Sequence, residues 1–482
     1  MTRILRTLDL SSSRSRSRFD VLILCAAMFI SLSYLIQFAF NPAGAIQGDS
    51  AQYGVAHPRD WDLLSFTGES LRNWPTVLLY LLFASDVAKV FFQFLISFFA
   101  VIVMLMQINS QFKGRTRILL VVLFSSLITT PQIINWNSVL LSESLLLSVT
   151  ILFFVSLRSF IFSNEKFGFW PLLATSYLWC ILKTTNVLLL MLIFASLVLF
   201  AVLRVRGSRI SHHSLIRLGV SLVLSGFFLV TWFNHPNQEF NRDINYRTYT
   251  AIAVLTDVNP RAAMLHAELS KIGELKCLEI GSPKSYEFYA AKLGGECQYS
   301  KIWISQNFYQ WYAKYLLSHP QEPVQLAAAG FIAGNSPVSL YAPNLSILPK
   351  PMQDLFFGER NFALRNLGFQ PYGVYETEEY DRTGMEVVVP ILAWLGIAFF
   401  LLLILLSRKS LRGLLRLKTV KLDFILVAAG VAGVSINSIT VPTEWFRENV
   451  YFFTLIYLSL IYLIGDLSKA FRDSSKSVAS GI

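Results

Sequence analysis

Long apolar runs constrain this chain more than any other feature of its sequence. A helix of about 20 apolar residues matches the hydrocarbon thickness of a bilayer. Such runs fall at 21–40, 90–108, 118–134, 138–157, 168–182, 185–203, 216–233, 387–406, 424–440 and 450–465. The chain is 15% charged, against roughly 25% in soluble proteins. The sequence therefore predicts a mainly helical, polytopic transmembrane bundle of about ten spans.

Lysine and arginine residues gather in every second loop and in both tails. The clusters lie at 3–18, 113–117, 158–166, 204–217, 408–421 and 469–476. By the positive-inside rule, both termini are predicted to be cytoplasmic, in a bacterial inner membrane, with the alternate loops on the periplasmic, outer side. Because these loops account for the net charge of +11, a nucleic-acid partner is not expected, whereas membrane lipids are.

The spacing of the runs divides the chain into three parts. Residues 1–233 form a membrane module of seven spans with a long first outer loop, 41–89. Residues 234–386 mix charge, Pro, Gly and aromatics and predict a mixed outer-side domain. Residues 387–482 form a second membrane module of three spans and a cytoplasmic tail. The apolar stretch 76–84 is too short to span, so it predicts a helix on the membrane surface or tucked against the bundle.

Two of the four cysteines, Cys277 and Cys297, lie in the 234–386 segment. If this segment faces an oxidising compartment, the two can form a disulfide. The alternative is a pair of free thiols.

Ionisable residues at the ends of spans are the best indication of chemistry, because each is costly there without a partner or a task. Asp49 follows the first run, in Gly48-Asp49-Ser50. Its carboxylate could accept a proton from a hydroxyl or hold a metal, or it could make an ordinary turn. Glu143 is expected about one and a half turns inside the fourth span. Its alternative role is an acidic residue favoured at a helix N-terminus.

Lys183 and Arg447 are cations at the outer ends of predicted spans. Each could stabilise the charge that develops on a phosphate leaving group. Each could instead extend to the lipid headgroups. Arg447 has Glu444 and Glu448 at helical spacing, and these could orient it.

The first outer loop holds further polar residues that form a candidate acceptor-binding or metal site. They are Tyr53, His57, Asp60, Asp62 and Glu69. With Asp49, their oxygens and one imidazole could bind a divalent ion such as Mg²⁺ or Mn²⁺. No cofactor is required by any motif, and the alternative is a solvated loop. The phosphate loop of ATPases and the His-Glu-x-x-His zinc motif are absent, so neither ATP-driven transport nor zinc proteolysis has support.

The order of these parts resembles the GT-C superfamily, integral membrane glycosyltransferases with lipid-linked sugar donors. In that family an acidic residue follows the first span, as Asp49 does in Gly48-Asp49-Ser50-Ala51-Gln52-Tyr53. Surface helices follow, as 72–84 suggests. Ser142-Glu143 at a span start and Arg447 near the last spans match bacterial members. The resemblance covers mainly 1–233, with a weaker match at 440–465, and the Trp-Trp-Asp-Tyr-Gly signature of oligosaccharyltransferases is missing.

The resemblance implies a reaction at the outer face of the membrane. A polyprenyl-phosphate sugar would be the donor, and a hydroxyl of a glycan, lipid or protein the acceptor. Asp49 would be the general base, Glu143 a second catalytic residue, and Arg447 and Lys183 the phosphate-binding residues. Two alternatives stay open. One is an outer-surface polysaccharide polymerase or ligase, which would not need Asp49. The other is a lipid or solute transporter, although the sequence shows no internal repeat.

Overall fold

The structure of the chain is a computed structural model. It describes residues 13–40, 42, 74–138, 140, 142–162, 169–183, 185–203, 219–220, 248, 250–252, 254–255, 262–280, 286–334, 358–359, 385–386, 395–402, 418–440 and 445–479.

The first membrane module begins with one long helix and continues as a series of shorter ones. In chain order these are α1 (Ser13–Phe40), α3 (Trp74–Leu82), α4 (Asp86–Gln111), α5 (Gly114–Ile128), α6 (Pro131–Ile134), the 3₁₀ turn η2 (Asn135–Ser138), α7 (Ser142–Phe162), α8 (Phe169–Leu182) and α9 (Thr185–Leu203). Gly114 has φ 60°, a left-handed conformation that glycine adopts without strain, so the chain can reverse sharply between α4 and α5.

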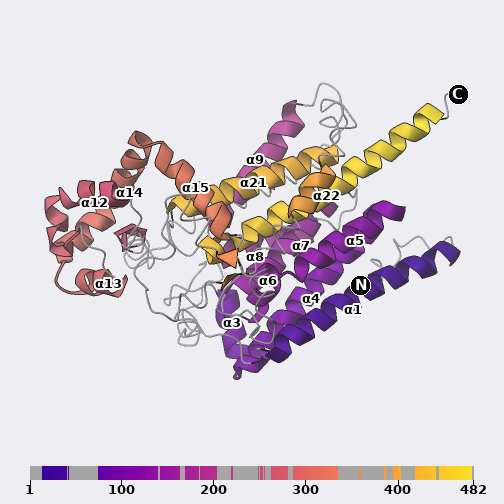
Figure 1. Cartoon of the computed structure of the whole chain (residues 1–482), viewed down its shortest axis with the longest axis horizontal. Coiled ribbons are helices and arrows are strands. Elements are labelled where there is room, and N and C mark those ends of the chain that lie inside the picture. The colour runs from indigo at the N-terminus through magenta and orange to yellow at the C-terminus, as the bar shows by residue number, and fades with distance from the viewer. Residues whose placement is uncertain are drawn as a thin grey trace.

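The middle of the chain is also mainly helical. It contains α12 (Ala262–Ser270), the 3₁₀ helix η4 (Gly273–Leu278), α13 (Tyr286–Gly294), α14 (Gln298–Ser318) and α15 (Gln321–Gly334). Two two-residue strands, β1 (Gly358–Glu359) and β2 (Met385–Glu386), pair antiparallel. The last helices are α21 (Lys418–Thr440) and α22 (Trp445–Ala479). In Figure 1, α22 lies beside α7 although the two are far apart in sequence, and α21 packs against α22 and α9.

Among the described residues, five helices are long and apolar enough to cross a membrane. They are Val21–Ala39, Asp86–Gln111, Ser142–Phe162, Val420–Ile439 and Asn449–Lys469, and the shorter apolar helices are Phe169–Leu182 and Thr185–Leu199. The chain is therefore a helical membrane protein. The count of ten spans stays a prediction, because 216–233 and 387–406 lie mostly outside the described residues.

The prediction of two spans at 118–134 and 138–157 is wrong at their junction. Helix α5 ends at Ile128, and α6 and η2 separate it from α7, which begins at Ser142 and extends to Phe162. Pro131 explains the break, since proline disfavours a helical conformation in the preceding residue and lacks an N–H for the helix ladder. Thr130 closes the end of α5 by donating its hydroxyl to the Leu127 carbonyl at 2.7 Å.

Helix α22 lies at the centre of the bundle and α1 at its edge. Of the span in α22, 94% is buried inside the protein, whereas only 22% of the span in α1 is. Helix α22 packs against α5, α7, α15 and α21. Helix α3, predicted as a surface or tucked helix, packs against α8 with Thr76, Val77 and Leu79 buried.

Side-chain contacts define two ends of this bundle. At the first, Tyr34 of α1 contacts Ser97 of α4, and Thr185 of α9 contacts Tyr451 of α22. We call it the Glu143 end, because α7 starts there. At the other, Arg158 of α7 meets α21 and α22, and we call it the Arg158 end. By the charge rule of the sequence analysis, the Glu143 end is predicted to be the outer one.

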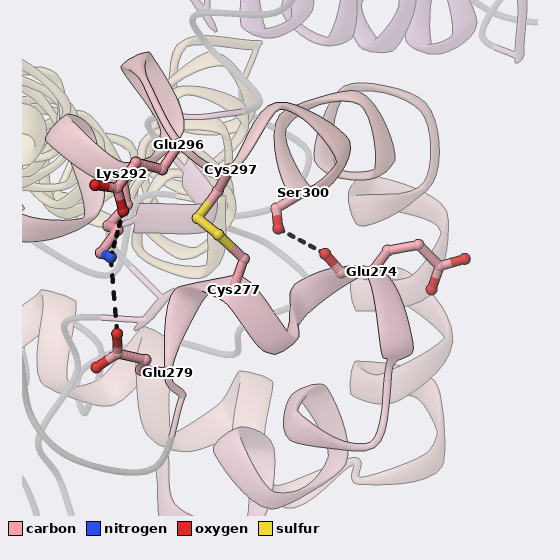
Figure 2. Close-up of a disulfide and its surroundings, with 7 residues drawn as sticks. All are labelled: Glu274, Cys277, Glu279, Lys292, Glu296, Cys297 and Ser300. Atoms are coloured by element: carbon pink, nitrogen blue, oxygen red, sulfur yellow. Dashed lines mark hydrogen bonds and ion pairs between the residues drawn. A yellow bond between two sulfur atoms is a disulfide. The ribbon is translucent and has the colours of Figure 1, made fainter.

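A disulfide-linked group of helices lies beyond the Glu143 end (Figure 1). Cys277 of η4 and Cys297 before α14 are bonded, with Cα atoms 5.7 Å apart, as the sequence predicts for this pair. Figure 2 shows that the bond joins η4 to the start of α14, where the Ser300 hydroxyl also donates to the Glu274 carbonyl at 2.6 Å. Lys292 contacts both Glu296 (2.6 Å) and Glu279 (3.7 Å) nearby. These contacts hold the group around its own apolar core.

Candidate functional site

Buried polar side chains gather at the Glu143 end of the bundle. We call them the polar cluster: Tyr34, Gln37, Ser97, Asn137, Ser138 and Ser144, from α1, α4, η2 and α7. The Tyr34 and Ser97 hydroxyls lie 2.8 Å apart. Asn137 donates to Ser97 at 3.3 Å and accepts from the Ser144 hydroxyl at 3.0 Å. Gln37 donates to Ser138 at 3.5 Å. Within an apolar bundle such groups are stable only because they satisfy one another.

Glu143 lies next to this cluster, in the first turn of α7 and only 4% exposed. The expectation that it lies one and a half turns inside a span is wrong, because α7 begins at Ser142. The N-terminal turn of a helix carries a partial positive charge and favours a carboxylate. The Ser142 hydroxyl donates to Glu143 Oε2 at 3.4 Å. Glu143 is thus a buried carboxylate beside hydroxyl groups, able to accept a proton or orient a bound hydroxyl.

Lys89 is a cation at this end that sequence reasoning missed. It lies in the first turn of α4, is 8% exposed, and pairs with Asp86 at 2.8 Å. Its ammonium group also lies 4.5 Å from the centre of the Tyr80 ring, a cation–π contact. The Tyr80 hydroxyl donates to the Leu140 carbonyl at 2.5 Å, just before Glu143. The sequence signal was a lysine entering an apolar run one turn after a capping Ser85.

The structure brings the backbones of Lys183 and Arg447 to the same end. Lys183 is half-buried and follows α8, and its carbonyl accepts from the Asn186 amide at 3.1 Å. Arg447 lies in the first turn of α22. The hydroxyls of Thr185 and Tyr451 lie 3.1 Å apart, which joins the start of α9 to the start of α22. Lys183 lies two residues before Thr185, and Arg447 lies four residues, about one helical turn, before Tyr451, so the two segments begin at the same end of the bundle.

The remaining predicted site residues lie outside the described part of the chain. These are Asp49, Tyr53, His57, Asp60, Asp62 and Glu69. Phe40 ends α1 at the Glu143 end, so the loop that carries Asp49 starts there. Within the described residues, no group of three His, Cys, Asp or Glu side chains is placed to hold a metal ion. A Mg²⁺ or Mn²⁺ site in the first loop therefore stays a prediction.

The Arg158 end contains a buried group of charges that sequence reasoning did not find. Arg158 of α7 pairs with Asp423 of α21 and, at 2.9 Å, with Asp466 of α22. Its guanidinium carbon lies 4.0 Å from the centre of the Tyr462 ring, and the Tyr462 hydroxyl donates to Gln107 at 2.9 Å. The assignment of Arg158 to a basic loop is wrong, because α7 continues to Phe162. The available signal was a carboxylate at the border of each of the last two predicted spans, Asp423 before 424–440 and Asp466 after 450–465.

Comparison with known proteins adds little to this description. No family model matches the chain, and no curated protein matches its sequence. Among solved structures, the chain is similar to ArnT from Cupriavidus metallidurans, a structure bound to undecaprenyl phosphate. The identity is 12% and the TM-score 0.32, over 90% of this chain and 77% of that one. A TM-score this low carries no argument, so no residue role is taken from ArnT. The described residues define a polytopic helical membrane protein.

Proposed function

We propose that the chain is a membrane glycosyltransferase that moves a sugar from a polyprenyl-phosphate donor to an acceptor hydroxyl at the outer face of an inner membrane. The supporting observation is the composition of the Glu143 end. There, a buried carboxylate, a buried lysine and the segments of Lys183 and Arg447 share the end at which the Asp49 loop begins. A lipid-linked phosphate would also lie at that level of the bilayer, at the ends of the spans.

The proposed reaction needs a base, a bound phosphate and a hydroxyl in line. Asp49 takes the proton of the acceptor hydroxyl while its oxygen attacks the anomeric carbon. The bond from that carbon to the phosphate oxygen breaks, and its electron pair leaves on the polyprenyl phosphate. Attack from the face opposite the leaving group inverts the anomeric configuration. The acceptor is a glycan, lipid or protein hydroxyl.

Lys183 and Arg447 serve the leaving group in this proposal. Cations placed before the reaction stabilise charge as it develops without rearrangement. Glu143 serves as a second carboxylate, which is held by the α7 N-terminus and orients a sugar or acceptor hydroxyl. A divalent ion in the Asp49 loop would add charge stabilisation at the same place.

The donor class is tested by lipid analysis of a strain that lacks the protein. Loss of the enzyme should make its polyprenyl-phosphate sugar accumulate, and mass spectrometry of the lipid extract would identify both the sugar and the polyprenyl chain. An unchanged lipid profile, together with unchanged surface glycans, would argue for the transporter or another function.

The role of Asp49 is tested with purified protein and that donor. Asp49→Asn keeps the size of the side chain and removes the proton acceptor, so turnover should fall by about 10²- to 10⁴-fold while donor binding is retained. Arg447→Ala should weaken donor binding as well, since the phosphate charge is already present in the ground state. Asp60→Asn is the matched control from the same loop. Full transfer by Asp49→Asn would refute the assignment, and an equal loss in Asp60→Asn would favour a shared metal site.

A further inference from the structure

The turn between α14 and α15 exposes two large apolar side chains. Leu317, in the last turn of α14, is 82% exposed, and Val324, in the first turns of α15, is 68% exposed. His319 and Pro320 form the turn between them. Single exposed apolar residues are common on proteins and explain nothing alone. The exposure of Leu317 and Val324 becomes informative because the turn lies close to the ends of the membrane spans.

Contacts with α21 and α22 fix the level of this turn. The Tyr312 hydroxyl donates to the carbonyl of Ile439, which is the last residue of one candidate span, at 3.3 Å. Asn449, the first residue of the next span, donates to the Gly330 carbonyl at 3.5 Å. Phe331 contacts Phe453, inside that second span, with ring centres 5.5 Å apart. Helix α15 therefore reaches past the end of a span, and α14 touches the end of another.

The distances along the two helices place the turn close to that boundary. Leu317 follows Tyr312 by about one and a half helical turns, or roughly 7 Å. Val324 precedes Gly330 by under two turns, or about 9 Å. The headgroup layer on each side of a bilayer is about 5–8 Å thick. Figure 1 shows α15 against the ends of α21 and α22, whereas α12 and α13 lie well beyond them.

The residues around the turn are of the kind that favours a membrane interface. Trp311 and His319 are partly exposed, and both stack on the buried ring of Tyr315, with ring centres 5.6 Å and 4.3 Å away. Rings with one polar edge are enriched where headgroups meet acyl chains. Lys314 is exposed on the same helix and long enough to reach a lipid phosphate.

We propose that the α14–α15 turn rests in the headgroup layer of the bilayer, with Leu317 and Val324 inserted toward the acyl chains. The occupant of this apolar surface is lipid, because an exposed apolar surface at the level of the span ends meets lipid unless another chain covers it. The turn is then a second membrane anchor for the disulfide-linked helices, in addition to their contacts with α21 and α22. This inference does not depend on the glycosyltransferase proposal.

Spin labelling in lipid nanodiscs tests this placement. In a chain in which Cys25 and Cys180 are replaced and the Cys277–Cys297 bond is kept, single cysteines at 317 and 324 would carry a nitroxide. The matched control is position 299. Tyr299 lies on the same helix with the same 82% exposure as Leu317, but about 27 Å away along the axis. All three native side chains are exposed, so the substitutions should leave the fold intact, and the retained disulfide checks this.

The expected result is a clear difference in collision with two quenchers. Labels at 317 and 324 should collide readily with oxygen, which concentrates in lipid, and poorly with a water-soluble nickel chelate. The label at 299 should show the reverse, with an oxygen-to-nickel ratio several-fold lower. Labels at 317 and 324 as accessible to nickel as the label at 299 would overturn the proposal. Exclusion of both reagents with dipolar coupling between labels would also overturn it, because a second copy would then cover the turn.

Discussion

Replacing Arg158 with methionine tests the buried charges at the Arg158 end. The native group contains one cation and two carboxylates, Asp423 with 0% and Asp466 with 8% side-chain exposure. Arg158→Met keeps an unbranched apolar stem about as long as the aliphatic part of the arginine, and leaves both carboxylates without their cation. Removing one partner of a buried ion pair costs about 3–5 kcal/mol, because the remaining charge has neither water nor a counter-charge. The loss should be at the upper end of that range, since two carboxylates lose one shared partner.

Companion variants separate charge from shape. Asp466→Asn leaves the Arg158–Asp423 pair intact and removes one of the two negative charges, so it should cost about 1 kcal/mol or less. The triple variant Arg158→Met, Asp423→Asn, Asp466→Asn removes every charge and should recover most of the stability lost in Arg158→Met. Arg158→Lys keeps the charge but cannot donate to two carboxylates in the same fork, so it should be intermediate.

The assay is the fraction of monodisperse protein left after heating in detergent, measured by size exclusion across a temperature series. Membrane proteins of this size unfold irreversibly, so the ranking of variants at one heating rate is the quantity to compare. The expected order is wild type close to Asp466→Asn, then the triple variant, then Arg158→Lys and Arg158→Met. An Arg158→Met protein as heat-resistant as the wild type would refute the reasoning, as would a triple variant no better than Arg158→Met.

Three further outcomes can be checked on the same protein. Gly330→Ala should destabilise the fold by about 1–3 kcal/mol, because a Cβ at this position would lie 1.7 Å from Ser438 Oγ. The control is Gly294→Ala, which has open space around it and should be nearly neutral in the same heating assay. Cys277→Ser removes the disulfide that closes a loop with a sequence separation of 20, and should destabilise the disulfide-linked helices by about 3 kcal/mol. The loss should be visible as faster proteolysis between residues 262 and 318, and a proteolysis rate equal to that of the wild type would contradict it. The hydrogen bond from Lys292 lowers the pKa of Glu296, so the small stabilisation from this exposed pair is present above pH about 4.3 and disappears as the pH falls through the lowered pKa. Glu296→Gln should remove that acid-side dependence from the proteolysis rate, and an unchanged pH profile would count against the pair.

The sequence was sufficient for features that depend on local composition. Apolar length located the spans at 21–40 and 424–440, and compartment reasoning paired Cys277 with Cys297. Both follow from properties that a short window of sequence carries, namely hydropathy and residue type.

Features that depend on distant partners could not be read in this way. Hydropathy ended the fourth span before Arg158 because a lone arginine lowers the local average, and nothing nearby indicates Asp423 or Asp466, which neutralise it from other helices. Lys89 was missed for a different reason: its partners Asp86 and Tyr80 are close in sequence, but an average of hydropathy does not show that the lysine is buried. The end of α5 before Pro131 could have been predicted from the chemistry of proline. Hydropathy alone did not show it, because the residues on both sides of Pro131 are apolar.

Only 22% of the span in α1 is buried inside the protein, and this affects what fixes the orientation of the helix. Lipid tails are as apolar as the outward side chains of this helix. Apolar contacts with lipid therefore give α1 little preference for one rotation about its own axis over another. The bonds from Tyr34 to Ser97 and from Gln37 to Ser138 do have such a preference. A slip of one residue would turn the helix by about 100° and break both. Two hydrogen bonds near the end of α1 therefore fix the rotation of the helix about its own axis, and with it the orientation of the helix at Phe40, where the predicted first outer loop begins.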